Sequence, residues 1–198
     1  MSTESDSVIS PEEILSNEFD YIAQTAAQAN EDRSSVISFF LIAVGSPLAA
    51  FFSTEMLGNS SSNLNSVSIL FCGLFFILTV LGTTTILQLA RLRAAWHESM
   101  MAMNHLKEFV VRNSSMDISA AFRWKTNTVP AKFKINSVSF FQAMEVAILS
   151  GLLFGAFTFF LFLAFNISNS PLIWGSSIGL GLFNIAFQIL LYRHFVNK

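Results

Sequence analysis

The stretch VSILFCGLFFILTVLGTTTILQLARLRAAWHESMMAMNHLKEFVVR, residues 67–112, decides the fold of this chain. Its first half, up to Ala90, is apolar and exceeds the roughly 20 residues that a helix needs to cross a bilayer. Its second half, from Arg91 onward, is amphipathic and too charged to remain in hydrocarbon. The stretch therefore predicts one continuous helix that leaves the membrane and continues into water.

The composition of the whole chain also indicates a membrane protein. Of its 198 residues, 53% are hydrophobic and 12% are charged, whereas about a quarter of the residues of soluble domains are charged. We predict an all-α, polytopic fold in which four transmembrane helices form two hairpins. The predicted spans are the four apolar blocks at 34–56, 67–90, 138–165 and 171–192.

The positions of the basic residues predict the orientation. The connections 57–66 and 166–170 contain no Lys or Arg, whereas the middle connection and the segments beside it contain most of them. Because basic residues near span ends stay in the cytoplasm, both termini and the middle connection are expected there. Residues 1–10 are acidic, lack signal-peptide features and are expected to be disordered, and 193–198 form a short tail. The expected location is the plasma membrane, with the bacterial inner membrane favoured.

Two charged arms are predicted to extend the first two spans as an antiparallel cytoplasmic stalk. The first arm, 11–33, begins at a capping Ser10 followed by Pro11, and the second arm is 91–112. Each arm carries residues spaced by threes and fours, which is typical of helices packed along a seam. One antiparallel register pairs them all. This stalk seam consists of Leu15, Phe19, Ile22, Ala26 and Ala29 on the first arm and Val110, Leu106, Met103, Ser99 and Trp96 on the second.

Charged residues also gather where the arms meet the predicted membrane boundary. They could form ion pairs, or they could be a solvated belt that fixes the depth of the helices, because exposed pairs contribute only about 0 to 1 kcal/mol. These inner-boundary charges are Glu31, Asp32, Arg33, Arg91, Arg93 and Arg193.

The middle connection, 113–137, mixes aromatic and basic residues such as Phe122, Trp124, Lys132 and Phe133. Such a mixture can stack on single-stranded nucleic acid, but beside two membrane spans it more often lies on anionic headgroups. We therefore expect anionic lipids of the inner leaflet as partners, and no nucleic acid.

The third and fourth spans each carry small residues at a spacing of four, which lets helix backbones approach closely in lipid. The simplest expectation is that the two small faces pack on each other, and the alternative is that one of them joins two subunits of a homo-oligomer. The residues are Ala147, Gly151 and Gly155 in the third span and Gly175 and Gly179 in the fourth.

Polar residues within the apolar blocks are candidates for a polar path. Glu145, Asn184 and Gln188 could line such a path, but Glu145 could equally lie at the interface, and isolated amides usually bond between helices. Common catalytic and phosphate-binding motifs do not occur in the sequence. His97 and His105 are too far apart along their helix for one metal ion. We expect no enzymatic activity, no cofactor and no metal.

Two functions remain after these exclusions. The preferred hypothesis is a non-enzymatic, self-associating membrane effector or anchor whose cytoplasmic stalk docks or senses a protein partner. The alternative is a small channel or transporter subunit with a polar path near Glu145, Asn184 and Gln188.

Overall fold

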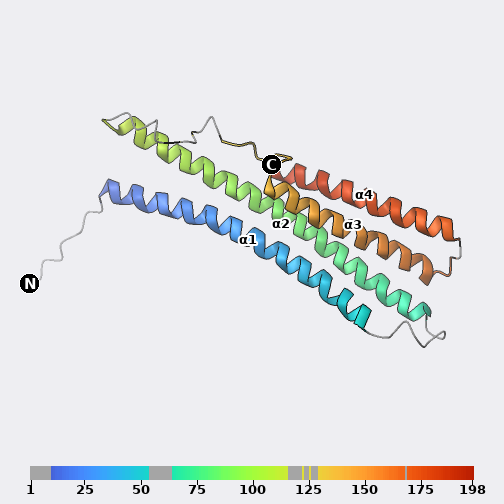
Figure 1. Cartoon of the computed structure of the whole chain (residues 1–198). Coiled ribbons are helices and arrows are strands. Elements are labelled where there is room, and N and C mark those ends of the chain that lie inside the picture. The colour runs from blue at the N-terminus through green and yellow to red at the C-terminus, as the bar shows by residue number, and fades with distance from the viewer. Residues whose placement is uncertain (1–9, 54–63, 116–121, 123–124, 126–128, 168) are drawn as a thin grey trace, which may run out of the picture.

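The structure is a computed structural model that describes residues 10–53, 64–115, 122, 125, 129–167 and 169–198. The described residues form four helices and no strand (Figure 1). The helices are α1 (Pro11–Ser53), α2 (Leu64–Asn113), α3 (Val138–Ala164) and α4 (Ser170–Val196).

Three of these helices, α2, α3 and α4, contain stretches that are long and apolar enough to cross a membrane. The prediction of an all-α membrane protein is confirmed at this level. The N-terminal segment, for which disorder is predicted, lies outside the described residues except for Ser10, as do residues 54–56 at the end of the first predicted span.

Helices α1 and α2 are longer than a membrane requires. They contain 43 and 50 residues, which correspond to about 65 and 75 Å at 1.5 Å per residue, whereas the hydrocarbon layer is about 30 Å thick. Helix α1 begins at the predicted cap, where the Glu13 amide donates to Ser10 Oγ at 3.2 Å, and it continues through Pro47. A large part of each long helix must therefore lie outside hydrocarbon when the helix crosses a membrane.

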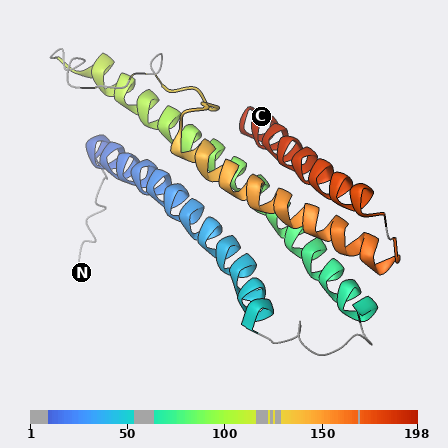
Figure 2. The same ribbon diagram turned by 45° about the vertical axis from the view of Figure 1, so that its right-hand side comes forward.

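Helices α3 and α4 contain 27 residues each and are joined by a short turn. In that turn Asn166 has a φ of 55°, the left-handed conformation that commonly ends a helix. The Asn169 side chain then caps α4 by accepting from the Leu172 amide at 3.3 Å. The turn returns the chain directly, so the two helices lie side by side (Figures 1 and 2).

Helix α2 is the centre of the arrangement. It contacts all three other helices, and α1 packs mainly against α2 on the side away from α4 (Figure 2). Buried apolar side chains fill the contacts, among them Phe40, Ile86, Leu89 and Val146. Many large apolar side chains point outward instead, including Phe39, Ile42, Phe76, Leu152 and Phe183. We call these outward-facing side chains the exposed apolar belt, and so many of them are suited to lipid rather than to water.

Candidate functional site

A cluster of buried polar side chains lies where α2, α3 and α4 meet. The Gln188 side chain, which is fully buried, donates from Nε2 to Ser150 Oγ at 2.6 Å and to Thr83 Oγ1 at 3.2 Å. Both hydroxyls donate in turn to the Thr79 carbonyl oxygen, at 3.4 and 3.1 Å. Asn184 Nδ2 donates to the Ser150 carbonyl oxygen at 3.3 Å. We call these five residues the polar core cluster, and they link three helices.

The cluster depends on a close approach of α2 to α3. A Cβ atom built on Gly82 would lie 2.5 Å from Ser150 Oγ, so a larger residue at this position would push the serine away. In lipid, where water does not compete, a hydrogen bond between helices contributes about 0.6 to 2 kcal/mol. The cluster therefore fixes how α2, α3 and α4 are rotated relative to one another.

One atom of the cluster lacks a partner. Because the Ser150 and Thr83 hydroxyls donate to Thr79, they present lone pairs to Gln188, and its NH₂ group must face them. Gln188 Oε1 is then buried without a hydrogen-bond donor among the described residues. A buried carbonyl without a donor costs about 1 to 3 kcal/mol, so the amide is the weakest member of the cluster.

The structure brings together two of the three residues predicted to form a polar path. Asn184 and Gln188 are both in the polar core cluster, whereas Glu145 is exposed on α3 and is not part of it. The sequence pattern does not single out Thr79, Thr83 and Ser150. A hydroxyl in an apolar helix usually bonds to its own backbone, as Thr79 does with the Phe75 carbonyl, so it gives little signal in a sequence.

The small face of α3 packs against α4 through the predicted Gly151 and Gly155, but not against the predicted glycines of α4. A Cβ atom on Gly151 would lie 2.8 Å from the Gly181 carbonyl oxygen, and one on Gly155 would lie 3.0 Å from that of Ser177. Gly175 and Gly179 have nothing within 4 Å of such an atom. The expectation that they face α3 is corrected: they are two positions out of phase with the contacting residues, which is about 200° around the helix. Ala147, the other predicted small residue, is buried.

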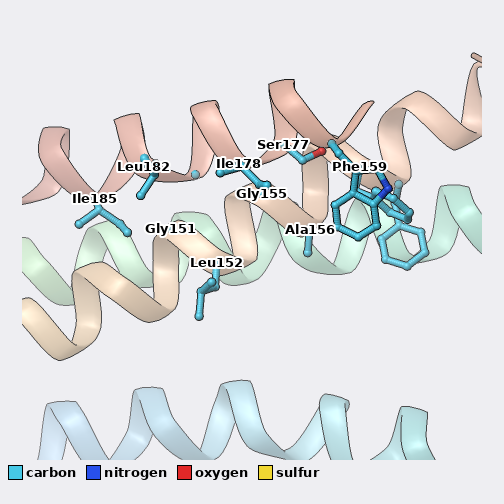
Figure 3. Close-up of a pocket in the computed structure, with 12 residues that line it drawn as sticks. Gly151, Leu152, Gly155, Ala156, Phe159, Ser177, Ile178, Leu182 and Ile185 are labelled. Atoms are coloured by element: carbon cyan, nitrogen blue, oxygen red, sulfur yellow. The ribbon is translucent and has the colours of Figure 1, made fainter. Parts of the chain in front are cut away.

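An apolar groove of about 370 Å³ runs beside this contact (Figure 3). Its walls are formed by side chains of α3 and α4, including Leu152, Ile178 and Leu182. The Phe159 and Trp174 rings lie 5.1 Å apart along it. Since the walls are almost entirely apolar, the groove is suited to hydrocarbon and not to an ion.

The residues of the predicted stalk seam are mostly shielded from solvent. Ile22, Ala26, Ala29, Ser99 and Met103 are buried. Of the other five, Phe19 is 43% exposed, and the remaining four, Leu15, Trp96, Leu106 and Val110, are intermediate. Burial thus follows the predicted spacing along both arms, while the role of these residues in binding a partner stays a prediction.

The inner-boundary charges do not form the suggested pairs. Within the described part of the chain, Glu31 and Asp32 are exposed and make no ion pair with Arg91 or Arg93. Arg93 is instead buried, at 8% exposure. Its Nε donates to the Lys132 carbonyl oxygen at 3.1 Å.

The basic groups among the inner-boundary charges also pack against aromatic rings. The Arg93 guanidinium lies 4.5 Å from the Trp96 ring centroid, and Arg193 lies 5.6 Å from that of Phe133. The Arg91 guanidinium lies 5.7 Å from the Phe195 ring. Stacking on an aromatic face is favourable for a guanidinium that has lost part of its water. Among the described residues these basic groups therefore contact aromatic rings rather than carboxylates, and a belt that fixes the depth of the helices stays a prediction.

The middle connection is anchored to the helices by an aromatic residue. The Phe133 ring packs edge-on against Phe140 at 5.7 Å and lies 6.4 Å from the Tyr192 ring. The Tyr192 hydroxyl shares a hydrogen bond of 3.1 Å with Ser139 Oγ. Trp124, which belongs to the predicted lipid-binding mixture, lies outside the described residues.

Comparisons of this chain with protein-family models, with curated proteins and with solved structures find no match. The fold and the exposed apolar belt define the class as an all-α membrane protein with three candidate transmembrane helices. Function must therefore be argued from the geometry of the chain itself.

Proposed function

We propose that the chain is a four-span protein of the bacterial inner membrane, with two hairpins and both termini in the cytoplasm. The proposal adds α1, from residue 34 onward, to the three candidate spans. It is supported by Phe39 and Ile42, which are 64% and 67% exposed and extend the apolar belt onto α1. The absence of basic residues from 57–66 and 166–170 supports the orientation.

In this membrane the protein acts as a non-enzymatic anchor and effector. Its cytoplasmic stalk, formed by the two arms, docks a protein partner. Docking displaces the arms, and this displacement is transmitted along the helices to the spans. The observation that carries this proposal is the continuity of α1 and α2, each of which is one helix from arm to span. A packed pair of unbroken helices transmits a displacement along its length, because a close-packed contact deforms little.

The chemistry of the first arm defines the partner. Ile14 and Tyr21, which are 56% and 66% exposed, lie on one face of α1, two turns apart. The acids Glu12, Glu13, Glu18 and Asp20 are also exposed on this part of the arm, and the sequence contains no Lys or Arg before Arg33. The partner is therefore a cytoplasmic protein that presents apolar side chains surrounded by Lys and Arg.

Self-association uses the face of α4 that the fold leaves open. Gly175 and Gly179 have free space above them, and the neighbouring Trp174 and Ile178 are 57% and 58% exposed. A second copy that approached this face would meet a small-residue stripe, which is the usual means of helix contact in lipid.

A photocrosslinking amino acid at Tyr21 tests the docking of a partner in native membranes. The expected result is one adduct with a cytoplasmic protein, lost when Glu18→Lys and Asp20→Lys are combined and retained with Glu31→Lys as the matched control. The same probe at Phe39 should give no adduct with that protein, because this side chain faces lipid. An adduct at Tyr21 with the mass of two chains, or one that survives the charge reversal, would overturn the proposal.

The channel alternative has weaker support. A conducting path needs polar groups that water can reach, whereas Gln188 and Ser150 are fully buried and Glu145 lies apart from them. Flux through liposomes that is altered by Gln188→Leu, with the fold retained, would favour this alternative.

A further inference from the structure

Basic groups from separate segments converge at the end of the apolar part of α2. Arg33 of α1 and Arg93 of α2 lie within electrostatic range of each other, and the Tyr192 hydroxyl of α4 lies near both. The positive charges of Lys132, in the middle connection, and of Arg93 also lower the pKa of His97, so both groups lie within electrostatic range of it. We call Arg33, Arg93, Lys132 and Tyr192 the inner-boundary cluster. Its three basic members repel one another.

Within the described part of the chain, the two arginines have hydrogen-bond donors that no residue accepts. Arg93 uses its Nε on the Lys132 carbonyl, and Arg33 Nε is buried without a partner. The other guanidinium nitrogens of both arginines meet no acceptor among the described residues. Burial lowers the pKa of the Arg33 guanidinium, although the group remains charged at neutral pH. A partly buried guanidinium without an anion is unfavourable, so the cluster has both the charge and the donors for an acidic ligand.

The position of the cluster identifies the ligand. Arg93 follows the apolar half of α2 by three residues, and Tyr192 lies within the last turns of α4. The exposed apolar belt begins directly beside it, at Phe141 and Leu190. The cluster therefore lies at the level where phospholipid headgroups meet hydrocarbon, on the side that is rich in basic residues.

We propose that Arg33 and Arg93 bind the phosphate group of an anionic phospholipid of the inner leaflet. The planar guanidinium groups supply paired N–H donors that match phosphate oxygens, and Lys132 adds positive charge. The bound phosphate offsets the repulsion between α1 and α2 at this level and so holds the two helices together where the arms begin. This inference rests on the proposed membrane orientation, but it requires no cytoplasmic partner.

Lipid titration of the purified full-length protein in mild detergent, followed by native mass spectrometry, tests the site. Phosphatidylglycerol should bind the wild type in preference to phosphatidylcholine, and Arg33→Gln should weaken this binding about tenfold. Arg33 makes no hydrogen bond to a described residue, so its replacement removes no such intrachain bond. Arg93→Lys keeps the positive charge but loses the paired N–H donors of the guanidinium, so a smaller loss of lipid binding is expected. Arg91→Gln, two residues away and exposed, is the matched control and should bind like the wild type.

Thermal unfolding in the same detergent separates the sources of the anion. Phosphatidylglycerol should raise the melting temperature of the wild type but not that of Arg33→Gln. Equal stabilisation by glycerol 3-phosphate would overturn the assignment to a lipid. Equal weakening of lipid binding by Arg91→Gln and Arg33→Gln would show that the cluster is only part of a general belt of charge, and would overturn the proposal.

Asp117 is the one carboxylate of the middle connection and lies outside the described residues. Destabilisation of the lipid-free protein by Asp117→Asn would show that the chain fills its own site, and would also overturn the proposal.

Because no partner is needed, this test is independent of the crosslinking experiment. Lipid binding can fail while docking at Tyr21 is retained, or the reverse.

Discussion

The contact between the two arms and the contact among α2, α3 and α4 are built on different principles. Along the arms, medium-sized apolar side chains such as Ile22 and Met103 are buried at regular intervals. Among the other helices, glycines and hydroxyls allow the backbones to come close, and amides bond between helices. This difference is the one expected if the proposed placement holds, with the arms in water and the other contact in lipid. Apolar burial stabilises a contact in water, whereas helices in lipid gain nothing from it and rely on close packing and hydrogen bonds.

Gly181→Val should have the largest effect, because it disrupts the close backbone contact between α3 and α4. A Cβ atom at this position would lie 2.9 Å from the Gly151 carbonyl oxygen, and backbone cannot move aside easily. We expect a loss of about 3 kcal/mol in the free energy of unfolding, measured by denaturation in detergent. Gly73→Val is the matched control, since nothing lies within 4 Å of its Cβ position. Equal losses for both variants would show that the α3–α4 contact is not as described.

Ile22→Ala should weaken the contact between the two arms. The side chain is 6% exposed, and removing a buried isoleucine to Cβ costs about 2 to 5 kcal/mol, with the lower end expected where only two helices meet. The effect should be local, so limited proteolysis should cut the first arm faster while α3 and α4 stay protected. Tyr21→Ala, at a 66% exposed position, should leave the cleavage rate unchanged. Unaltered proteolysis of Ile22→Ala would mean that the arms do not depend on this seam.

Gln188→Met tests how much hydrogen bonding contributes to the contact among α2, α3 and α4, because it removes the amide at nearly constant volume. The variant loses two hydrogen bonds but also removes the unsatisfied Oε1, and the two hydroxyls keep the Thr79 carbonyl as acceptor. These terms nearly cancel, so unfolding in detergent should change by no more than about 1 kcal/mol. A loss well above this value would show that the amide carries more of the helix contact than its geometry indicates.

The smallest effect is expected from His97 on the second arm. Burial, followed by the charge of Lys132 and then that of Arg93, lowers the pKa of His97 below its ordinary value of 6.5. A hydrogen bond with the Pro130 backbone and the charge of Glu98 act in the opposite direction. The folded state therefore favours neutral histidine, and its contribution is present above the ordinary pKa and declines as the pH falls through that value. His97→Gln should flatten the pH dependence of the melting temperature between about pH 7.5 and 5.5. His105→Gln, at an exposed position on the same arm, is the matched control.

The fold was largely predictable where the pattern is long and repeated. The apolar half of 67–112 and its charged continuation predicted the helix α2, and the cap at Ser10 predicted where α1 begins. Burial at Ile22, Ala26 and Met103 followed the predicted spacing because seven-residue periodicity fixes one face of a helix. The span on α1 and the cytoplasmic placement of the stalk remain proposals.

The sites were less predictable because they depend on how helices are rotated. Gly175 and Gly179 have the same spacing as Gly151 and Gly155, yet only the α3 pair faces its neighbour. The hydrogen bond from Gln188 to Ser150 joins residues 38 positions apart, and no local sequence pattern predicts it.

By itself the sequence determined that the chain is helical, that it belongs in a membrane, and where its polar arms begin, because these properties depend on the local run of apolar and charged residues. The tertiary structure alone decided which small residues touch, which polar groups meet at Gln188, and that Arg33 and Arg93 converge without a carboxylate among the described residues. Rotation and register of packed helices set these contacts, and many rotations are compatible with the same apolar composition.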